Sequence, residues 1–179
     1  MSSKQPTLDA AAIQRILEER ARTLARSPSN EVAVKTLPLV ELTVGTERFG
    51  INLQYVQEIQ PLKGLAPVPG VPAHWAGVVN LRGRLYPVLD LRRYLMLPAA
   101  GPPEGGQLVV VAAAKLEVAL WASDIIGIRH VPQTEIRTSL LESGNLPPSL
   151  VVGVTAELLS VLDLDVLLAD PKLVVQEQG

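Results

Sequence analysis

The stretch WAGVVNLRGRLYPVLDLRRYL, residues 75–95, contains two apolar segments that are separated by a turn signal. Val78–Leu81 and Leu85–Leu89 are the apolar segments, and each has the length of a short strand. Arg82 and Gly83 stand between them, and glycine adopts positive φ without the steric cost of a Cβ atom. The stretch therefore predicts a β-hairpin with its turn at Arg82-Gly83.

Two aspartates follow apolar segments in the same way and allow two interpretations. Asp90 precedes Leu91–Met96, and Asp163 precedes a similar apolar segment that ends at Leu168. Aspartate is a preferred N-cap residue, because its carboxylate accepts hydrogen bonds from the free N–H groups of a first helical turn. A pair of catalytic carboxylates is the alternative. We expect helix capping, because one structural role then explains both positions.

The two halves of the chain repeat each other in residue type and order. FGINLQYVQEI (Phe49–Ile59) aligns without a gap with VALWASDIIGI (Val118–Ile128). GVVNLRGRLYPVLDLRRYL (Gly77–Leu95) aligns with GVTAELLSVLDLDVLL (Gly153–Leu168) when the first hairpin turn is shortened by three residues. A duplicated unit of this kind is typical of two small closed or nearly closed barrels, because closure removes exposed strand edges. We predict an all-β fold of two five-stranded SH3-like barrels.

Alternating apolar and polar residues predict the remaining strands. Pro38–Val44 and Phe49–Leu53 indicate a hairpin with one buried face and one solvated face, and Glu41 falls on the solvated face. Tyr55–Ile59 follows as an extended segment or a helical turn. In the second half we expect strands over Leu108–Ala113, Val118–Ala122, Ile125–Val131, Leu150–Thr155 and Leu158–Leu162.

An amphipathic pattern over Leu8–Arg26 predicts a helix that is added to the barrels at the N-terminal end. This helix either packs on its own domain or is an arm that contacts a neighbour or a second chain. We expect it to be separable, because a linker connects it to a complete duplicated domain. The expected organisation is a tail and helix at 1–29, a linker at 30–36, the duplicated domain at 37–170, and a tail at 171–179. Within the duplicated domain we expect the elements of the two barrels to interleave around a break at about 99–106.

Composition and charge predict a soluble protein with an aliphatic core. The chain has 179 residues, of which 47% are hydrophobic and 3% aromatic, which is enough for a large core. A net charge of −2 without a basic run argues against a nucleic-acid partner. The absence of cysteine excludes disulfides, thiolate catalysis and cysteine-type zinc sites. We expect a cytoplasmic protein without membrane insertion, because the first residues lack a signal-peptide core and Leu108–Ala114 is too short to span a bilayer.

The sequence has no motif that is typical of catalysis, phosphate binding or metal coordination. It contains two histidines, His74 and His130, and their spacing is not that of a metal site. We therefore expect no metal, no organic cofactor and no enzymatic activity. A Ser-His-Asp set that assembles only in space stays open, and with it the alternative of a small barrel enzyme or ligand-binding domain.

Arg82 also allows two interpretations. An arginine at a hairpin turn is commonly just solvated. If Asn80 fixes the turn, however, the guanidinium is held on a rigid scaffold and suits a carboxylate on a partner. Glu58 is a second charge, and Val56 and Ile59 flank it. This mixed patch is either a binding edge or a strand with one solvated face.

Three stretches in this order resemble the signature of the CheW family, the adaptor proteins of bacterial chemotaxis. They are ERFGINLQYVQEI (residues 47–59), P-x-x-x-x-GVVNLRG from Pro72, and PVLDLR (residues 87–92). The resemblance extends from about Leu37 to about Leu168. The added N-terminal helix and a last hairpin without an NLRG equivalent depart from the family pattern.

The resemblance implies a two-barrel fold and a non-catalytic adaptor that couples transmembrane chemoreceptors to a CheA-type histidine kinase. It implies barrel-to-barrel contact with the kinase's CheW-like domain and a helix-in-groove contact with the receptor's cytoplasmic tip between the barrels. It also implies a location at receptor arrays on the inner face of the bacterial membrane. An array that controls pili, gliding or development is the alternative, and the N-terminal helix allows self-association. The residues that match segments tied to partner contacts are Val56, Glu58, Ile59, Asn80, Arg82 and Gly83.

Overall fold

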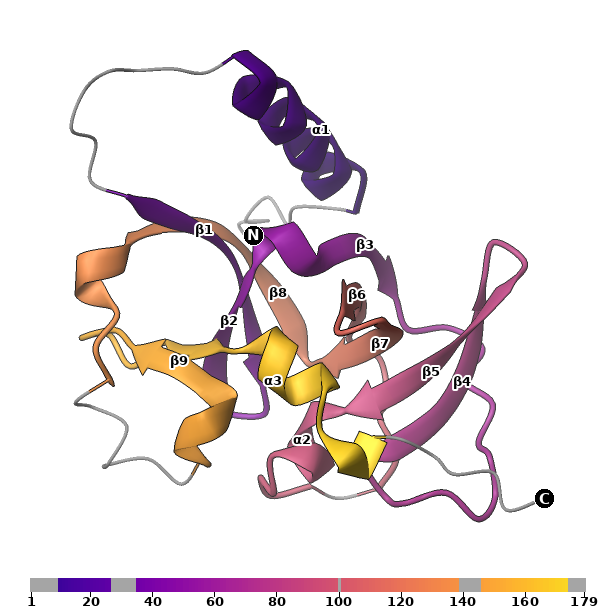
Figure 1. Cartoon of the computed structure of the whole chain (residues 1–179). Coiled ribbons are helices and arrows are strands. Elements are labelled where there is room, and N and C mark those ends of the chain that lie inside the picture. Colours follow the sequence, from indigo (N-terminus) through magenta and orange to yellow (C-terminus); the bar gives the residue numbers. More distant parts are fainter. Residues whose placement is uncertain (1–9, 27–34, 100, 139–145, 174–179) are drawn as a thin grey trace, which may run out of the picture.

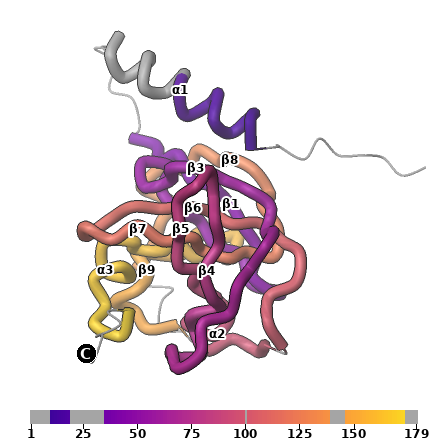
Figure 2. Tube along the Cα trace, turned by 90° about the vertical axis from the view of Figure 1, so that its right-hand side faces the viewer, coloured from indigo at the N-terminus to yellow at the C-terminus, as the bar shows by residue number. Residues whose placement is uncertain are grey.

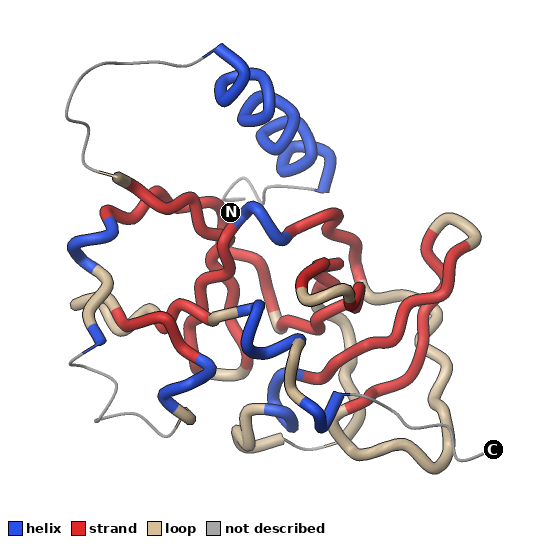
Figure 3. Tube along the Cα trace, in the orientation of Figure 1, coloured by secondary structure: helices blue, strands red, loops and turns tan. Residues whose placement is uncertain are grey.

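The protein is described by a computed structural model that covers residues 10–26, 35–99, 101–138 and 146–173. Its strands are β1 (Thr36–Val44), β2 (Glu47–Asn52), β3 (Val56–Pro61), β4 (Trp75–Leu81), β5 (Arg84–Asp90), β6 (Gln107–Ala113), β7 (Leu116–Ala122), β8 (Asp124–Pro132), β9 (Val151–Val154) and β10 (Ser160–Leu162). Its helices are α1 (Ala10–Arg26), α2 (Leu91–Tyr94) and α3 (Leu164–Leu168), with 3₁₀ turns η1 (Leu53–Tyr55), η2 (Gln133–Glu135), η4 (Pro148–Leu150) and η5 (Pro171–Leu173). The strands form two five-stranded sheets, in the orders β8-β1-β2-β10-β9 and β3-β6-β7-β5-β4 (Figures 1 and 3).

The predicted hairpin is formed by β4 and β5, and its turn is the one that the sequence indicates. Arg82 has a φ of 55° and Gly83 a φ of 83°, so both central residues are left-handed, as in the two-residue turns that match strand twist. The Asn80 side chain closes the turn, because its Oδ1 accepts a hydrogen bond from the Gly83 N–H at 2.8 Å. The hairpin prediction is confirmed.

The internal repeat extends to the pairing register. Val161 of β10 pairs in parallel with Gly50 of β2, and Val88 of β5 pairs in parallel with Ala119 of β7. The sequence alignment equates these two pairs residue for residue. The two sheets also have the same order once β3, β6, β7, β5 and β4 are replaced by β8, β1, β2, β10 and β9. The predicted all-β fold from a duplicated five-stranded unit is confirmed.

Each sheet takes one strand from the other half of the repeat. β3 follows β2 along the chain but pairs with β6, and β8 follows β7 but pairs with β1. Isolated bridges between Ala66 and Val78 and between Arg137 and Val154 then join the segments that follow β3 and β8 to β4 and β9. These bridges nearly close each sheet into a barrel.

The core has three parts. One cluster lies within each sheet's own barrel, around Leu39 and Leu159 in one sheet and around Val88 and Val110 in the other. The third and largest cluster contains residues of both sheets, such as Ile51. The shared cluster ties the two barrels into one packed body.

The expected solvated face of the β1–β2 hairpin is wrong at Glu41, which is only 5% exposed. Arg48 donates from Nε to Glu41 Oε1 at 2.9 Å, and Arg129 Nε lies 3.5 Å from Oε2. These two cations compensate the burial of the carboxylate. Alternation alone cannot reveal such pairing, because Arg129 belongs to β8.

Helix α1 packs on β3 (Figure 2), which is the first of the two interpretations that the sequence allowed. Ile13 is 1% exposed and joins the shared core, and Leu17 packs against that core. Leu8 and the side chain of Leu24 lie outside the described residues. At the other end, Leu173 is buried although the sequence places it in a tail.

Candidate binding surface

The two charged residues that the sequence singled out meet on the surface. Arg82 Nη2 lies 3.4 Å from Glu58 Oε1, and the two side chains are 80% and 18% exposed. Glu58 lies on β3 and Arg82 at the tip of the β4–β5 hairpin, so the sheet brings together residues from two separate motifs. The Gln60 amide also donates to the Glu58 carboxylate and holds it in place.

A second ion pair continues this surface along the hairpin. Arg84 Nη2 lies 2.7 Å from Glu117 Oε2, and the Arg84 guanidinium lies 5.3 Å from the centre of the Tyr86 ring. Leu85 beside it is 67% exposed. We refer to Glu58, Arg82, Arg84 and Leu85 as the tip surface. Arg84 was not predicted from the sequence. The available signal was that arginines stand on both sides of the turn glycine, at positions 82 and 84.

The two apolar residues that flank Glu58 are buried, so β3 has one solvated face here, which is one of the two interpretations that the sequence allowed. Val56 is 5% exposed and Ile59 4%, and both belong to the shared core. The physical reason is a bulge between Val56 and Glu58 in the pairing with β6. A bulge shifts the alternation by one residue, so Val56 and Ile59 share the core side while Glu58 faces the hairpin tip.

The two predicted capping aspartates are confirmed. Asp90 Oδ1 accepts a hydrogen bond from the Arg92 N–H at 3.0 Å, and Asp163 Oδ1 accepts one from the Val166 N–H at 3.3 Å. Asp90 is fully buried, and the Arg92 guanidinium pairs with it at 2.9 Å. Helix capping therefore accounts for both carboxylates, and Asp90 has an ion pair in addition.

His74 lies in an aromatic cluster at the junction of α2 and the segment that follows α3. Its ring centre is 5.6 Å from that of Trp75 and 5.9 Å from that of Tyr94. Burial lowers the pKa of His74. Burial also raises the pKa of Tyr94, whose hydroxyl donates to Asp170 at 2.6 Å. Among the residues that the structure describes, no group of three or more His, Asp or Glu could hold a metal ion.

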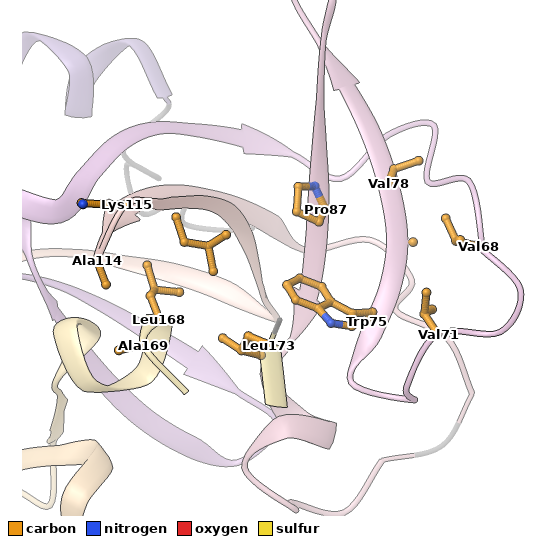
Figure 4. A pocket seen from close by; sticks show the side chains of 12 residues that line it. Val68, Val71, Trp75, Val78, Pro87, Ala114, Lys115, Leu168, Ala169 and Leu173 are labelled. Carbon is orange, nitrogen blue, oxygen red and sulfur yellow. The ribbon is translucent and has the colours of Figure 1, made fainter. Parts of the chain in front are cut away.

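An apolar cavity of about 710 Å³ lies between the β4–β5 hairpin, the β6–β7 turn and the segment after α3 (Figure 4). Trp75, Val78 and Leu168 line it, and Lys115 is its one ionisable lining residue. Such a lining accepts apolar side chains but supplies no acid–base pair. A second cavity, of about 540 Å³, is polar, and its Arg129 and Glu157 form an ion pair with each other. In the described part of the chain, no helix is long and apolar enough to cross a membrane.

The structure defines the class of protein, a duplicated all-β domain whose hairpin tip exposes charged side chains. A model of the CheW-like domain matches residues 38–172, so the chain belongs to the CheW family. The family recognised in the sequence is thereby confirmed. Its members are non-catalytic scaffold proteins, which confirms the prediction that the chain is not an enzyme.

Individual relatives agree with this assignment. The chemotaxis protein CheW of Rhizobium meliloti is 29% identical over 118 residues, which are 66% of this chain and 76% of that protein. Protein FrzA of Myxococcus xanthus is 29% identical over 134 residues, or 73% of this chain and 78% of FrzA. The crystal structure of the scaffolding protein TtCheW from Thermoanaerobacter tengcongensis has a TM-score of 0.67 at 17% identity, covering 77% of this chain and 96% of TtCheW.

Proposed function

We propose that this chain is an adaptor that couples chemoreceptors to a CheA-type histidine kinase at the inner face of the bacterial membrane. The observation that carries the proposal is the ion pair between the exposed Arg82 and the partly buried Glu58. These residues come from two separate motifs of the family resemblance, and they meet on one surface that a rigid turn presents.

The geometry of this pair suits a contact with a partner. The guanidinium is 80% exposed and lies 3.4 Å from the carboxylate, and ion pairs so exposed to water contribute little to stability. A partner carboxylate or helix end can therefore engage Arg82 at a small energetic cost. Exclusion of water at the interface would then strengthen the electrostatic interactions of both side chains with the partner.

The partners are proposed from the family resemblance. The kinase contributes a CheW-like domain for barrel-to-barrel contact, and the receptor contributes its helical tip for a helix-in-groove contact. We assign the tip surface, with Asn80 and Gly83 as the residues that shape its turn, to these contacts.

The second candidate is an adaptor of a related array that controls pili, gliding or development. It is favoured by the matches to FrzA of Myxococcus xanthus, at 29% identity, and to PilI of Pseudomonas aeruginosa, at 26%. These values equal those of relatives named chemotaxis protein CheW. The kinase that co-purifies with the chain from its own cells distinguishes the two candidates.

The test compares binding with melting in the same variants. Arg82→Ala is expected to change the stability by no more than about 0.5 kcal/mol, as is usual for surface substitutions. It should weaken binding to the co-purified kinase and receptor fragments about tenfold, as loss of a central charged contact does. Glu58→Ala should behave alike, and Arg137→Ala, an exposed arginine of the other sheet, is the control. Unchanged binding of Arg82→Ala would exclude the tip surface, and the absence of any co-purifying kinase would overturn the proposed function.

A further inference from the structure

Helix α1 contacts the body through a narrow stripe. Ile13 is 1% exposed, whereas Ala10 and Leu17 are partly buried against the same core cluster. These three residues follow the i, i+3, i+7 spacing with which an amphipathic helix fits an apolar groove. Gln14 and Glu18, which directly follow Ile13 and Leu17 in the sequence, are exposed.

The surface under α1 is β3. Both views place the helix along this strand (Figures 1 and 2), and β3 is the element that α1 contacts most. Ile13 belongs to the same core cluster as Val56 and Ile59. Glu58, on the other side of the same strand, is part of the tip surface. Helix α1 therefore packs on β3 next to its apolar side, while the charged side of the strand carries part of the tip surface.

Helix α1 itself is not part of either sheet. Helix α1 contributes no strand to either sheet, and residues 27–35 separate it from the start of β1. Among the described side chains of the helix, only Ile13 is fully buried. In its described part, the helix is thus attached mainly through one fully buried side chain, and a helix attached in this way can be displaced by another helix of similar shape.

We propose that α1 occupies in cis a helix-binding seat on β3, and that an amphipathic helix of a partner displaces α1 when it binds. This inference rests on the proposed function for the identity of the partner, the helical tip of a receptor. Displacement would uncover the side of β3 that carries Val56 and Ile59, next to Glu58. The apolar and charged parts of the patch that the sequence predicts would then form one continuous surface.

Occupation in cis lowers the apparent affinity for a partner. The apparent affinity equals the intrinsic affinity multiplied by the fraction of molecules with an open seat. If α1 is docked about nine-tenths of the time, release of α1 raises the apparent affinity about tenfold. This gain is the quantity to measure.

The experiment uses the full-length chain and two neighbouring substitutions. Ile13→Asp places a charge on the buried face of α1 and releases the helix, whereas Gln14→Asp adds the same charge on its exposed face. The first probe is a labelled peptide of residues 10–26, with a peptide that carries Ile13→Asp as its control. The peptide should bind the Ile13→Asp chain about tenfold more tightly than the wild-type or Gln14→Asp chain. Failure to bind the Ile13→Asp chain would overturn the seat.

The second probe is a purified fragment that contains the cytoplasmic helical tip of a chemoreceptor from the same cells. It should bind the Ile13→Asp chain about tenfold more tightly than the Gln14→Asp chain. Equal binding to both chains would overturn displacement and leave the proposed function intact. Binding to neither chain, while the peptide still binds, would overturn the proposed function and the partner named here.

Folding of the variant is checked separately. If Ile13→Asp unfolds the whole domain, α1 is part of the core and the proposal is overturned. The milder Ile13→Ala, followed by hydrogen exchange, gives an independent measure of the same property. The amides of α1 should exchange faster than in wild type while those of β1 and β6 keep their protection. An equal loss of protection in the helix and both strands would contradict a displaceable helix.

Discussion

Two glycines occupy equivalent positions of the repeat, but the neighbours that they accommodate differ. A Cβ atom on Gly77 would lie 2.3 Å from the carbonyl oxygen of Ala66, whereas one on Gly153 would lie 2.5 Å from Cγ2 of Ile136. A backbone oxygen in a bridge cannot move aside, whereas the Ile136 methyl can move by rotation about χ1, at a cost because a β-branched side chain is stiff there. Gly77 also has a φ of 146°, which adds strain for any other residue.

We therefore expect Gly77→Ala to lower the free energy of unfolding by about 3 kcal/mol, and Gly153→Ala by about 1 kcal/mol. Urea unfolding of both variants measures the difference. Gly64→Ala is the control for strain alone, because Gly64 has a φ of 69° and no atom within 4 Å of its Cβ position. If Gly77→Ala and Gly64→Ala were equal, the close approach of Ala66 would not constrain the barrel.

The pKa of His74 gives the stability a pH dependence. Burial holds it below the ordinary value of 6.5, and the charge of nearby Asp170 only partly opposes this. Between the folded pKa and about 6.5 the unfolded chain binds more protons than the folded chain. The stabilisation by neutral His74 is therefore complete above about pH 6.5 and is lost as the pH falls through this window.

We expect the melting temperature to fall between pH 7.5 and pH 5.5, and to fall less in His74→Gln. The matched control is His130→Gln, since His130 is exposed. Asp170 does not interfere with this comparison. Burial raises its pKa, but the hydrogen bonds from the Tyr94 hydroxyl and the Lys172 N–H, together with the charges of Lys172 and His74, outweigh burial and leave the pKa below the ordinary 3.8. An identical pH dependence in His74→Gln and wild type would exclude His74 as the source.

At the scale of single residues, the sequence predicted roles that depend on near neighbours in the chain. Asn80 closes its turn three residues later, and Asp90 caps the helix that starts at the next residue. The predictions from the sequence failed where the role of a residue depends on a neighbour that is distant in the chain. The cations that compensate the buried charge of Glu41 include Arg129, which belongs to β8. The bulge that places Val56 on the core side is a feature of the pairing between β3 and β6.

At the scale of elements, the two capped helices allow a direct comparison. Asp90 is fully buried, caps α2 and pairs with Arg92, whose side chain is 12% exposed. Asp163 caps α3 through one hydrogen bond and is partly exposed. Removal of Asp90 therefore costs a cap and also leaves a nearly buried cation without its partner.

We expect Asp90→Ala to lower the free energy of unfolding by about 3–4 kcal/mol and Asp163→Ala by about 1 kcal/mol. Chemical unfolding that is followed by circular dichroism gives both values. Asp90→Asn, which keeps a capping oxygen but removes the charge, should fall between them. Equal losses in the two alanine variants would mean that the Asp90–Arg92 pair adds nothing to the cap.

The strands themselves were predictable, because period-two alternation and turn residues are local signals. An interleaving of the elements of the two barrels was expected, but the identity of the strands that change sheets was not predictable, because nothing in β3 or β8 shows which hairpin it will join. Comparison of the repeats predicts only that the two halves have the same structure. A barrel built from one half alone and a barrel that takes one strand from the other half would show the same repeat in the sequence. Whether α1 packs on the body was undecidable for a similar reason, since an amphipathic stripe does not specify what covers it.

At the scale of the whole molecule, the exchanged strands and the shared core couple the two barrels. Neither sheet is complete without a strand from the other half, since β8 pairs with β1 and β3 pairs with β6. The largest core cluster also draws residues from both sheets. Loss of packing in one barrel should therefore destabilise the other, and the chain should unfold in one cooperative transition.

Leu159→Ala tests this coupling. Leu159 is fully buried in the core of the sheet that contains β1, whereas both tryptophans, Trp75 and Trp121, lie in the other sheet. The substitution should lower the free energy of unfolding by about 3 kcal/mol, as expected for a cavity in a packed core. Tryptophan fluorescence and circular dichroism should show the same shift, although the cavity is remote from the fluorophores in the sheet order. Leu158→Ala, at a side chain that is 72% exposed, should leave both transitions in place. A fluorescence transition that stays at its wild-type midpoint while the circular dichroism shifts would show that the barrels unfold separately.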